Sequence, residues 1–167
     1  RISDTEFAAR LALFLWSSLP DKELTALARA GELREPQVLK QQIKRMLASG
    51  KASALTDNFA GQWLYLRNLP YHFPDVFEFP EFTIPLRHSI QRETELFFTR
   101  ILKDDLPIFD FLNADYSYLN EPLAKHYGID GVKGYALRKV SLSEQSHRGG
   151  LLGQASILTL TSNPNHT

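Results

Sequence analysis

The sequence predicts a mainly α fold, an irregular multi-helix bundle with a long loop rich in aromatic residues and proline. Three observations support this. Apolar residues recur at helical spacing over most of the chain. Ser, Asp or Asn stands where these periodic segments begin, and Gly or Pro stands where they end. Only residues 137–142 alternate like a strand, and they do so weakly, so at most a minor β element is expected there.

Four helices are expected before residue 70, each with a start or stop signal. Ser3 and Glu6 have the spacing of a capping box, so the first helix begins there, and Pro20 ends it. The next three span residues 22–30, capped by Asp21; 36–49, opened by Pro36; and 54–69. The last of these places Leu55, Phe59, Trp63 and Leu66 on one face, which predicts that this face is buried.

Residues 71–85 interrupt the helical pattern with three prolines and five aromatic residues. We expect an ordered, extended loop whose rings pack between helices. Alternatively, the rings form a shelf for a partner protein or a sugar, because aromatic side chains offer a large contact area at a low entropic cost. The five rings belong to Tyr71, Phe73, Phe77, Phe79 and Phe82.

A long helix is expected over residues 86–103, with Ile90, Phe97 and Ile101 facing inward and charged residues, including Glu93, facing outward. The chain after it is expected to be irregular with short elements. These are one helical turn at 107–112, a helix at 121–127 capped by Asn120, the strand at 137–142 and a helix at 150–160.

Composition excludes several classes of function. The 19 basic and 19 acidic residues cancel, so no global field attracts the chain to nucleic acid or an anionic membrane. No apolar run approaches the roughly 20 residues that span a bilayer. Cysteine is absent, which excludes disulfides, thiolate metal sites, catalytic thiols and covalent c-type haem attachment within this chain.

Motifs for metal binding and catalysis are weak. The five histidines are scattered, and no pair has the spacing that places two imidazoles on one helix face. A single Glu144-x-x-His147 resembles half of a di-iron motif, which needs a second copy on a facing helix. We therefore expect no metal site, no catalytic residues and no cofactor held by this chain alone.

Arg148, Gly149 and Gly150 precede an expected helix and contain the elements of an anion or partner contact. Free amides at a helix start and a guanidinium both attract negative charge. The alternative is structural: the two glycines let the backbone approach a neighbouring helix, and Arg148 pairs with a nearby carboxylate.

Several segments together resemble two consecutive helical domains of unknown function from large exported proteins of planctomycete type. The first domain corresponds to residues 1–112 and the second, as its N-terminal part, to 113–167; the two are expected to pack as one unit. The resembling segments are residues 3–21, 59–64, 92–98, 115–121, 123–128 and 148–164.

The resemblance implies an extracytoplasmic location, periplasmic or at the cell surface. It also implies a neighbouring domain or subunit that carries c-type haem. The leading hypothesis is a non-catalytic scaffold or docking module of such a protein. One alternative is a component of an electron-transfer complex in which His126 or His147 faces the haem of a neighbour. A second alternative is carbohydrate binding through residues 71–82.

Overall fold

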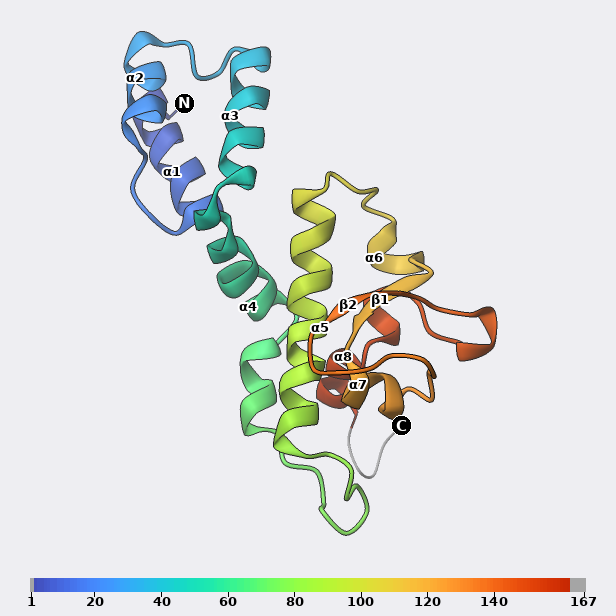
Figure 1. Ribbon diagram of the computed structural model, residues 1–167. Coiled ribbons are helices and arrows are strands. Elements are labelled where there is room, and N and C mark those ends of the chain that lie inside the picture. Colours follow the sequence, from blue (N-terminus) through green and yellow to red (C-terminus); the bar gives the residue numbers. More distant parts are fainter. Residues whose placement is uncertain (1, 163–167) are drawn as a thin grey trace. The chain divides into compact units, whose positions relative to one another are not determined.

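The computed structural model describes residues 2–162 and confirms the mainly α fold (Figure 1). The chain divides into two compact units, residues 1–59 and residues 60–167, and each is described by itself. The boundary expected between residues 112 and 113 lies within the second unit. The expected boundary separates two families of domains, whereas the observed one separates two compact units, so the expected boundary stays a prediction. Residues 163 and 164, the last two of the resembling segment 148–164, lie outside the described residues.

The first unit is a group of three helices, α1 (Asp4–Trp16), α2 (Lys22–Ala30) and α3 (Pro36–Ala48). The short 3-10 helix η1 (Gly50–Ala52) follows α3. The expected capping box is present, since the Ser3 hydroxyl accepts from the Glu6 amide and the Glu6 carboxylate accepts from the Ser3 amide. The expected cap of α2 by Asp21 is also confirmed. These local signals therefore fix where the helices begin.

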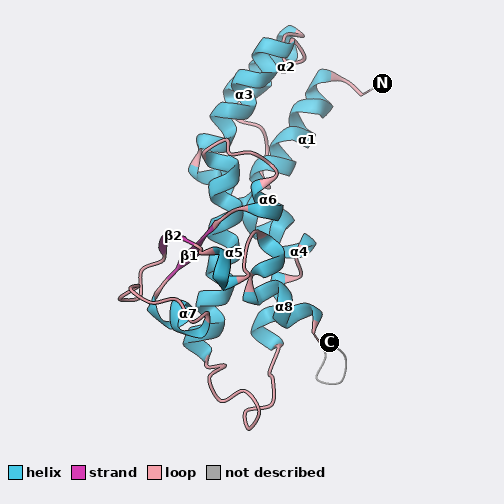
Figure 2. Cartoon of the chain, turned by 90° about the vertical axis from the view of Figure 1, so that its right-hand side faces the viewer, coloured by secondary structure: helices cyan, strands magenta, loops and turns pink. Residues whose placement is uncertain are grey.

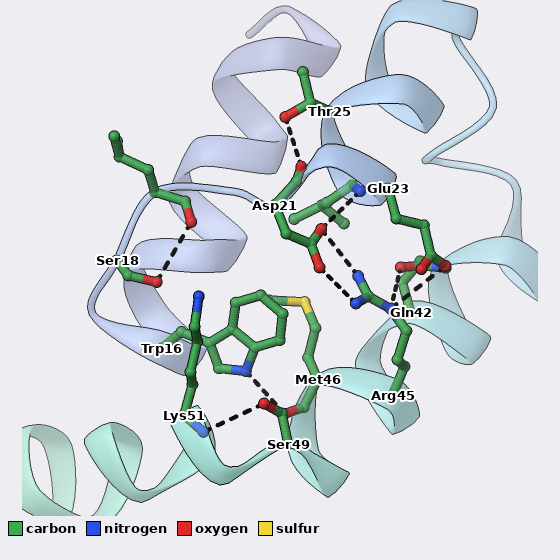
Figure 3. Close-up of polar contacts among 12 residues, drawn as sticks. Trp16, Ser18, Asp21, Glu23, Thr25, Gln42, Arg45, Met46, Ser49 and Lys51 are labelled. Atoms are coloured by element: carbon green, nitrogen blue, oxygen red, sulfur yellow. Dashed lines mark hydrogen bonds and ion pairs between the residues drawn. The ribbon is translucent and has the colours of Figure 1, made fainter.

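Side-chain contacts tie the three helices of this unit together (Figure 3). The Asp21 carboxylate caps α2 and also pairs with Arg45 of α3, with 2.6 Å between Nη1 and Oδ2. The Arg45 guanidinium lowers the pKa of Asp21, because a hydrogen bond to the charged form favours ionisation. Trp16 of α1 is buried and donates from Nε1 to the Met46 carbonyl of α3 at 2.9 Å.

The prediction of a single helix at residues 54–69 is wrong, because the helix is interrupted near its centre. The π-helix η2 (Leu55–Ala60) and the short α4 (Gly61–Trp63) form its first part, and the 3-10 helix η3 (Leu66–Tyr71) follows. Tyr65 between them has φ +55°, and this left-handed residue ends α4 and changes the direction of the side chains. Leu55 and Leu66 are buried as expected, whereas Phe59 and Trp63 are largely exposed.

The second unit is built around its longest helix, α5 (Ile84–Lys103), which Thr83 caps (Figures 1 and 2). The elements that follow it in the chain are α6 (Asp110–Asn113), β1 (Tyr116–Leu119), α7 (Glu121–His126), β2 (Arg138–Ser141), η4 (Glu144–Ser146), η5 (Leu151–Gly153) and α8 (Ala155–Thr161). Helix α5 contacts α6, β1, α7 and α8 among them, and it also contacts η3. The helix expected at 150–160 is thus divided into η5 and α8.

Strand β2 confirms the strand expected at residues 137–142, and it pairs with β1 in an antiparallel register that sets Tyr116 opposite Ser141. No strand is predicted at β1. All four of its residues are buried, so its sequence lacks the alternation of polar and apolar residues by which a half-buried strand is predicted.

Two clusters of buried apolar side chains form the core of the second unit, and α5 contributes to both. Around Ile90 pack residues of η3, β1, α7 and α8, namely Leu69, Leu119, Leu123 and Ala155. Around Phe97 pack Ile101, Ala114, Tyr116, Tyr118 and Leu151. Among the described residues, none of the helices is both long and apolar enough to cross a membrane.

Candidate functional site

The best-formed polar site of the second unit is centred on Glu93 of α5, between the two core clusters. The prediction that Glu93 faces outward is wrong, because its side chain is completely buried. Its position on α5 is three residues after Ile90 and four before Phe97, both of which are also fully buried. Glu93 therefore lies on the apolar face of the helix.

Two hydroxyl groups donate to the Glu93 carboxylate. Ser117 of β1 donates to Oε1 at 2.5 Å, and Tyr127, directly after α7, donates to Oε2 at 2.6 Å. The Tyr127 hydroxyl in turn accepts from the Ala155 amide at the start of α8, at 2.8 Å. One carboxylate thus joins α5 to β1, and through Tyr127 to both α7 and α8.

Burial dominates the ionisation of this site. It raises the pKa of Glu93 to about 7, although the hydrogen bonds from Ser117 and Tyr127 and the charge of Arg148 act in the opposite direction. Burial also raises the pKa of the Tyr127 phenol, and the negative charge of Glu93 adds to this rise. The proton on the Tyr127 oxygen is therefore held firmly, which fits its role as a donor to Glu93.

Arg148 covers one side of this site. Its guanidinium carbon lies 3.9 Å from the centre of the Tyr127 ring, and its Nη1 donates to the Gly153 carbonyl at 2.8 Å. Its positive charge favours the ionised form of Glu93. The hydrogen bond from the Arg148 guanidinium thus goes to a backbone carbonyl, and the predicted pairing of Arg148 with a carboxylate stays a prediction.

Gly150 allows a close approach between two backbone segments. A Cβ atom at this residue would lie 2.5 Å from the carbonyl carbon and oxygen of Leu112 in α6, and Gly150 also has φ +54°. At Gly149, a Cβ atom would lie 3.1 Å from the Ala114 carbonyl oxygen. The glycine pair therefore serves packing, since a larger residue at 150 collides with backbone that has little freedom to move.

Gln154 completes what we call the Glu93 cluster, namely Glu93, Ser117, Tyr127, Arg148 and Gln154. The Gln154 Oε1 accepts from the Thr94 hydroxyl at 2.6 Å, and Thr94 also contacts Ser156 at 2.6 Å. All five members of the cluster line a cavity with a volume of about 10 Å³, which is room for about one water molecule. The cavity is too small for an organic substrate.

The two histidines considered for haem contact lie at the surface. His126 ends α7 with its ring centre 5.7 Å from that of Tyr127, and partial burial together with the charge of Arg148 lowers its pKa. His147 follows η4, has φ +49° and is exposed. In the part of the chain that the structure describes, no group of three or more His, Asp or Glu side chains could hold a metal ion.

Tyr71 is the last residue of η3, and the aromatic residues that follow it lie on an exposed loop, which projects beyond the N-terminal end of α5 in both views (Figures 1 and 2). Phe77 is 92% exposed, Tyr71 80%, Phe73 75% and Phe79 46%. The expectation that the rings pack between helices is therefore wrong for these four. It holds for Phe82, which packs against the core cluster around Ile90.

Hydrogen bonds within the loop hold it in a defined course. The Phe77 and Phe79 amides donate to the side chain and the carbonyl of Asp75, both at 2.8 Å, and the Phe82 amide donates to the Phe79 carbonyl at 3.0 Å. At one end, the Arg87 guanidinium lies over the Phe73 ring, 4.9 Å from its centre. The loop is thus an ordered surface that presents rings.

The chain matches a protein family of unknown function. The family model described as PSD4, protein of unknown function (DUF1592), matches residues 2–129. The chain belongs to this family. The match agrees with the resemblance to a domain of unknown function. No curated protein and no solved structure shows significant similarity to the chain.

The stretch matched by the DUF1592 family contains three members of the Glu93 cluster, Glu93, Ser117 and Tyr127, whereas Arg148 and Gln154 follow it. Of the five, only Arg148 is a candidate from sequence. One signal could have found Glu93: the positions 86, 90, 93, 97 and 101 have the spacing of one helix face, and four of them are apolar. Nothing in the sequence alone places Ser117, Tyr127 and Gln154 beside it.

Proposed function

We propose that this chain is a non-catalytic docking module whose contact surface is the aromatic loop together with the last residue of η3 and the first of α5, residues 71–84. The observation that carries the proposal is the exposure of four aromatic rings on a loop of defined course, together with Val76 and Ile84, which are 69% and 73% exposed. Exposed large apolar side chains gathered on one segment commonly mark an interaction site. Burying one such ring against a partner contributes roughly 1.5–3 kcal/mol.

The charge of the loop indicates the chemistry of the partner. Asp75, Glu78 and Glu81 are exposed between the rings, and the sequence has no Lys or Arg from residue 68 to residue 86. The loop therefore favours a protein that surrounds an apolar patch with Lys and Arg. An anionic membrane or a nucleic acid would instead be repelled by the three carboxylates.

The family resemblance adds a setting to this chemistry. We propose that the module belongs to an exported, extracytoplasmic protein and that its partner is a basic c-type cytochrome carried by a neighbouring domain or subunit. In this arrangement the partner supplies the haem and this chain supplies the acidic, aromatic contact surface. The Glu93 cluster supports a structural role for the rest of the second unit, because its cavity of about 10 Å³ has room for only about one water molecule.

The proposal is tested by titrating the ¹⁵N-labelled chain with a purified basic c-type cytochrome at low and high salt. We expect chemical-shift changes confined to residues 71–84, and a dissociation constant that rises at least tenfold in high salt. Phe77→Ser should weaken binding about tenfold, because it removes a ring that is 92% exposed in the free protein.

The matched control is Phe109→Ser, which removes a ring that is 68% exposed outside the loop and should leave the affinity unchanged. An acidic c-type cytochrome provides the second control, since it carries the same haem with the opposite surface charge. Equal binding of both cytochromes, or shift changes outside the loop, would reject the proposal. Binding on a glycan array that is lost in Phe77→Ser would replace the protein partner with a carbohydrate.

A further inference from the structure

We propose that the cavity of the Glu93 cluster is a binding site for one internal water molecule, which links the Gln154 side-chain amide to the Glu93 carboxylate. This inference is independent of the docking function. It concerns how the segment 148–156 is held against α5.

The first observation is an unpaired donor. Gln154 is 2% exposed, and its Nε2 atom is buried without a hydrogen-bond partner in the protein. Among the described residues, no other buried side-chain nitrogen or oxygen atom lacks a partner. Exchanging the amide oxygen and nitrogen leaves Oε1 unpaired instead, so either orientation requires a further partner. Leaving a buried polar group unpaired costs about 1–3 kcal/mol, which is large enough to retain a bound molecule.

The second observation is the size and lining of the cavity. Its volume of about 10 Å³ matches the space that one water molecule needs. Gln154 lines it together with the carboxylate of Glu93 and the hydroxyl groups of Ser117 and Tyr127. These groups supply the two to four polar partners that a buried water typically has.

The charges around the cavity favour a neutral occupant. An anion would lie against the Glu93 carboxylate, and a cation would lie against the Arg148 guanidinium and the Gln154 donor. Water accepts from Gln154 Nε2 and donates to Glu93, whose two oxygens each accept one hydroxyl group and keep further acceptor capacity. Of an anion, a cation and a water molecule, only water satisfies both the Gln154 donor and the Glu93 carboxylate.

A crystal structure at high resolution tests this proposal. We expect density for one water within hydrogen-bond distance, roughly 2.7–3.2 Å, of both the Gln154 amide and a Glu93 oxygen. In solution, the Gln154 side-chain amide protons should show a nuclear Overhauser effect to a long-lived water. Gln154→Met has a similar size and no donor, so the water density should be absent from the crystal structure of this variant. Gln145→Met, at an exposed position, is the matched control.

Two results would overturn the proposal. One is a cavity without density in a well-ordered map of the wild-type protein, and the other is a peak that exchanges for bromide, which identifies an anion. The wild-type map is decisive even where Gln154→Met fails to fold, because it does not depend on a variant.

Discussion

At the scale of single residues, the ionisation of Glu93 links the buried cluster to stability. Burial raises the pKa of Glu93 from 4.5 to about 7, so the folded chain binds a proton that the unfolded chain has already released. The stabilisation from the protonated form is complete below pH 4.5 and is lost as the pH rises to about 7. Above about pH 7, the contribution of Glu93 to the free energy of unfolding no longer changes with pH.

The variant Glu93→Gln tests this effect, because glutamine has the same shape and does not ionise. We expect the free energy of unfolding of the wild type to fall relative to that of the variant between about pH 4.5 and 7. The expected difference is on the order of 3 kcal/mol. Urea unfolding at closely spaced pH values measures it. Glu144→Gln, at an exposed position, should follow the wild type, and parallel curves for Glu93→Gln and the wild type would contradict the prediction.

At the scale of secondary-structure elements, local signals predict the helix ends and tertiary contacts decide the rest. Ser3, Asp21 and Asn120 cap their helices as predicted, because each side chain accepts a hydrogen bond from an amide only three residues away. Strand β1 and the left-handed Tyr65 carry no such local signal.

In the candidate site, too, local sequence patterns predict one part and tertiary contacts decide the rest. Its central residue, Glu93, shares the helical spacing of an apolar face, whereas its partners Ser117, Tyr127 and Gln154 come from distant segments. Their meeting depends on how β1, α7 and α8 pack against α5. Short-range sequence patterns contain no information on that packing.

Gly150→Ala tests the close approach between the segment after β2 and α6. The new methyl group would lie 2.5 Å from Leu112 backbone atoms, and alanine disfavours φ +54°, so we expect a loss of about 3 kcal/mol or more. Urea unfolding with circular dichroism measures this loss. Gly128→Ala separates the two causes, since Gly128 has φ +69° with open space around it and should lose only about 1–2 kcal/mol. Equal losses in the two variants would exclude a steric role for Gly150.

At the scale of the whole molecule, the two units differ in size. The clusters around Ile90 and Phe97 and the Glu93 cluster lie within residues 60–167, and the first unit has buried apolar side chains of its own, among them Leu24, Leu33 and Met46. The first unit has 59 residues, and a unit of that size buries only about 60% of the surface that its unfolded chain exposes. Its stability is accordingly expected to be the smaller.

We therefore predict that residues 60–167 fold without the first unit. The shortened chain should unfold in one cooperative transition, keep its near-ultraviolet circular dichroism and retain the pH dependence that Glu93 causes. It should also retain binding through residues 71–84, since the aromatic loop belongs to this unit. A shortened chain without fixed near-ultraviolet signals would show that the second unit depends on the first.

The two tryptophans provide natural reporters of this division, because each unit contains one of them. Trp16 is 5% exposed and its indole is hydrogen-bonded within the first unit, whereas Trp63 is 53% exposed in the second. A sheltered indole emits at shorter wavelength than one in contact with water. The fluorescence spectrum of the unmodified protein is thus a sum of two components. Unfolding of the first unit should shift only the component at shorter wavelength, which comes from Trp16.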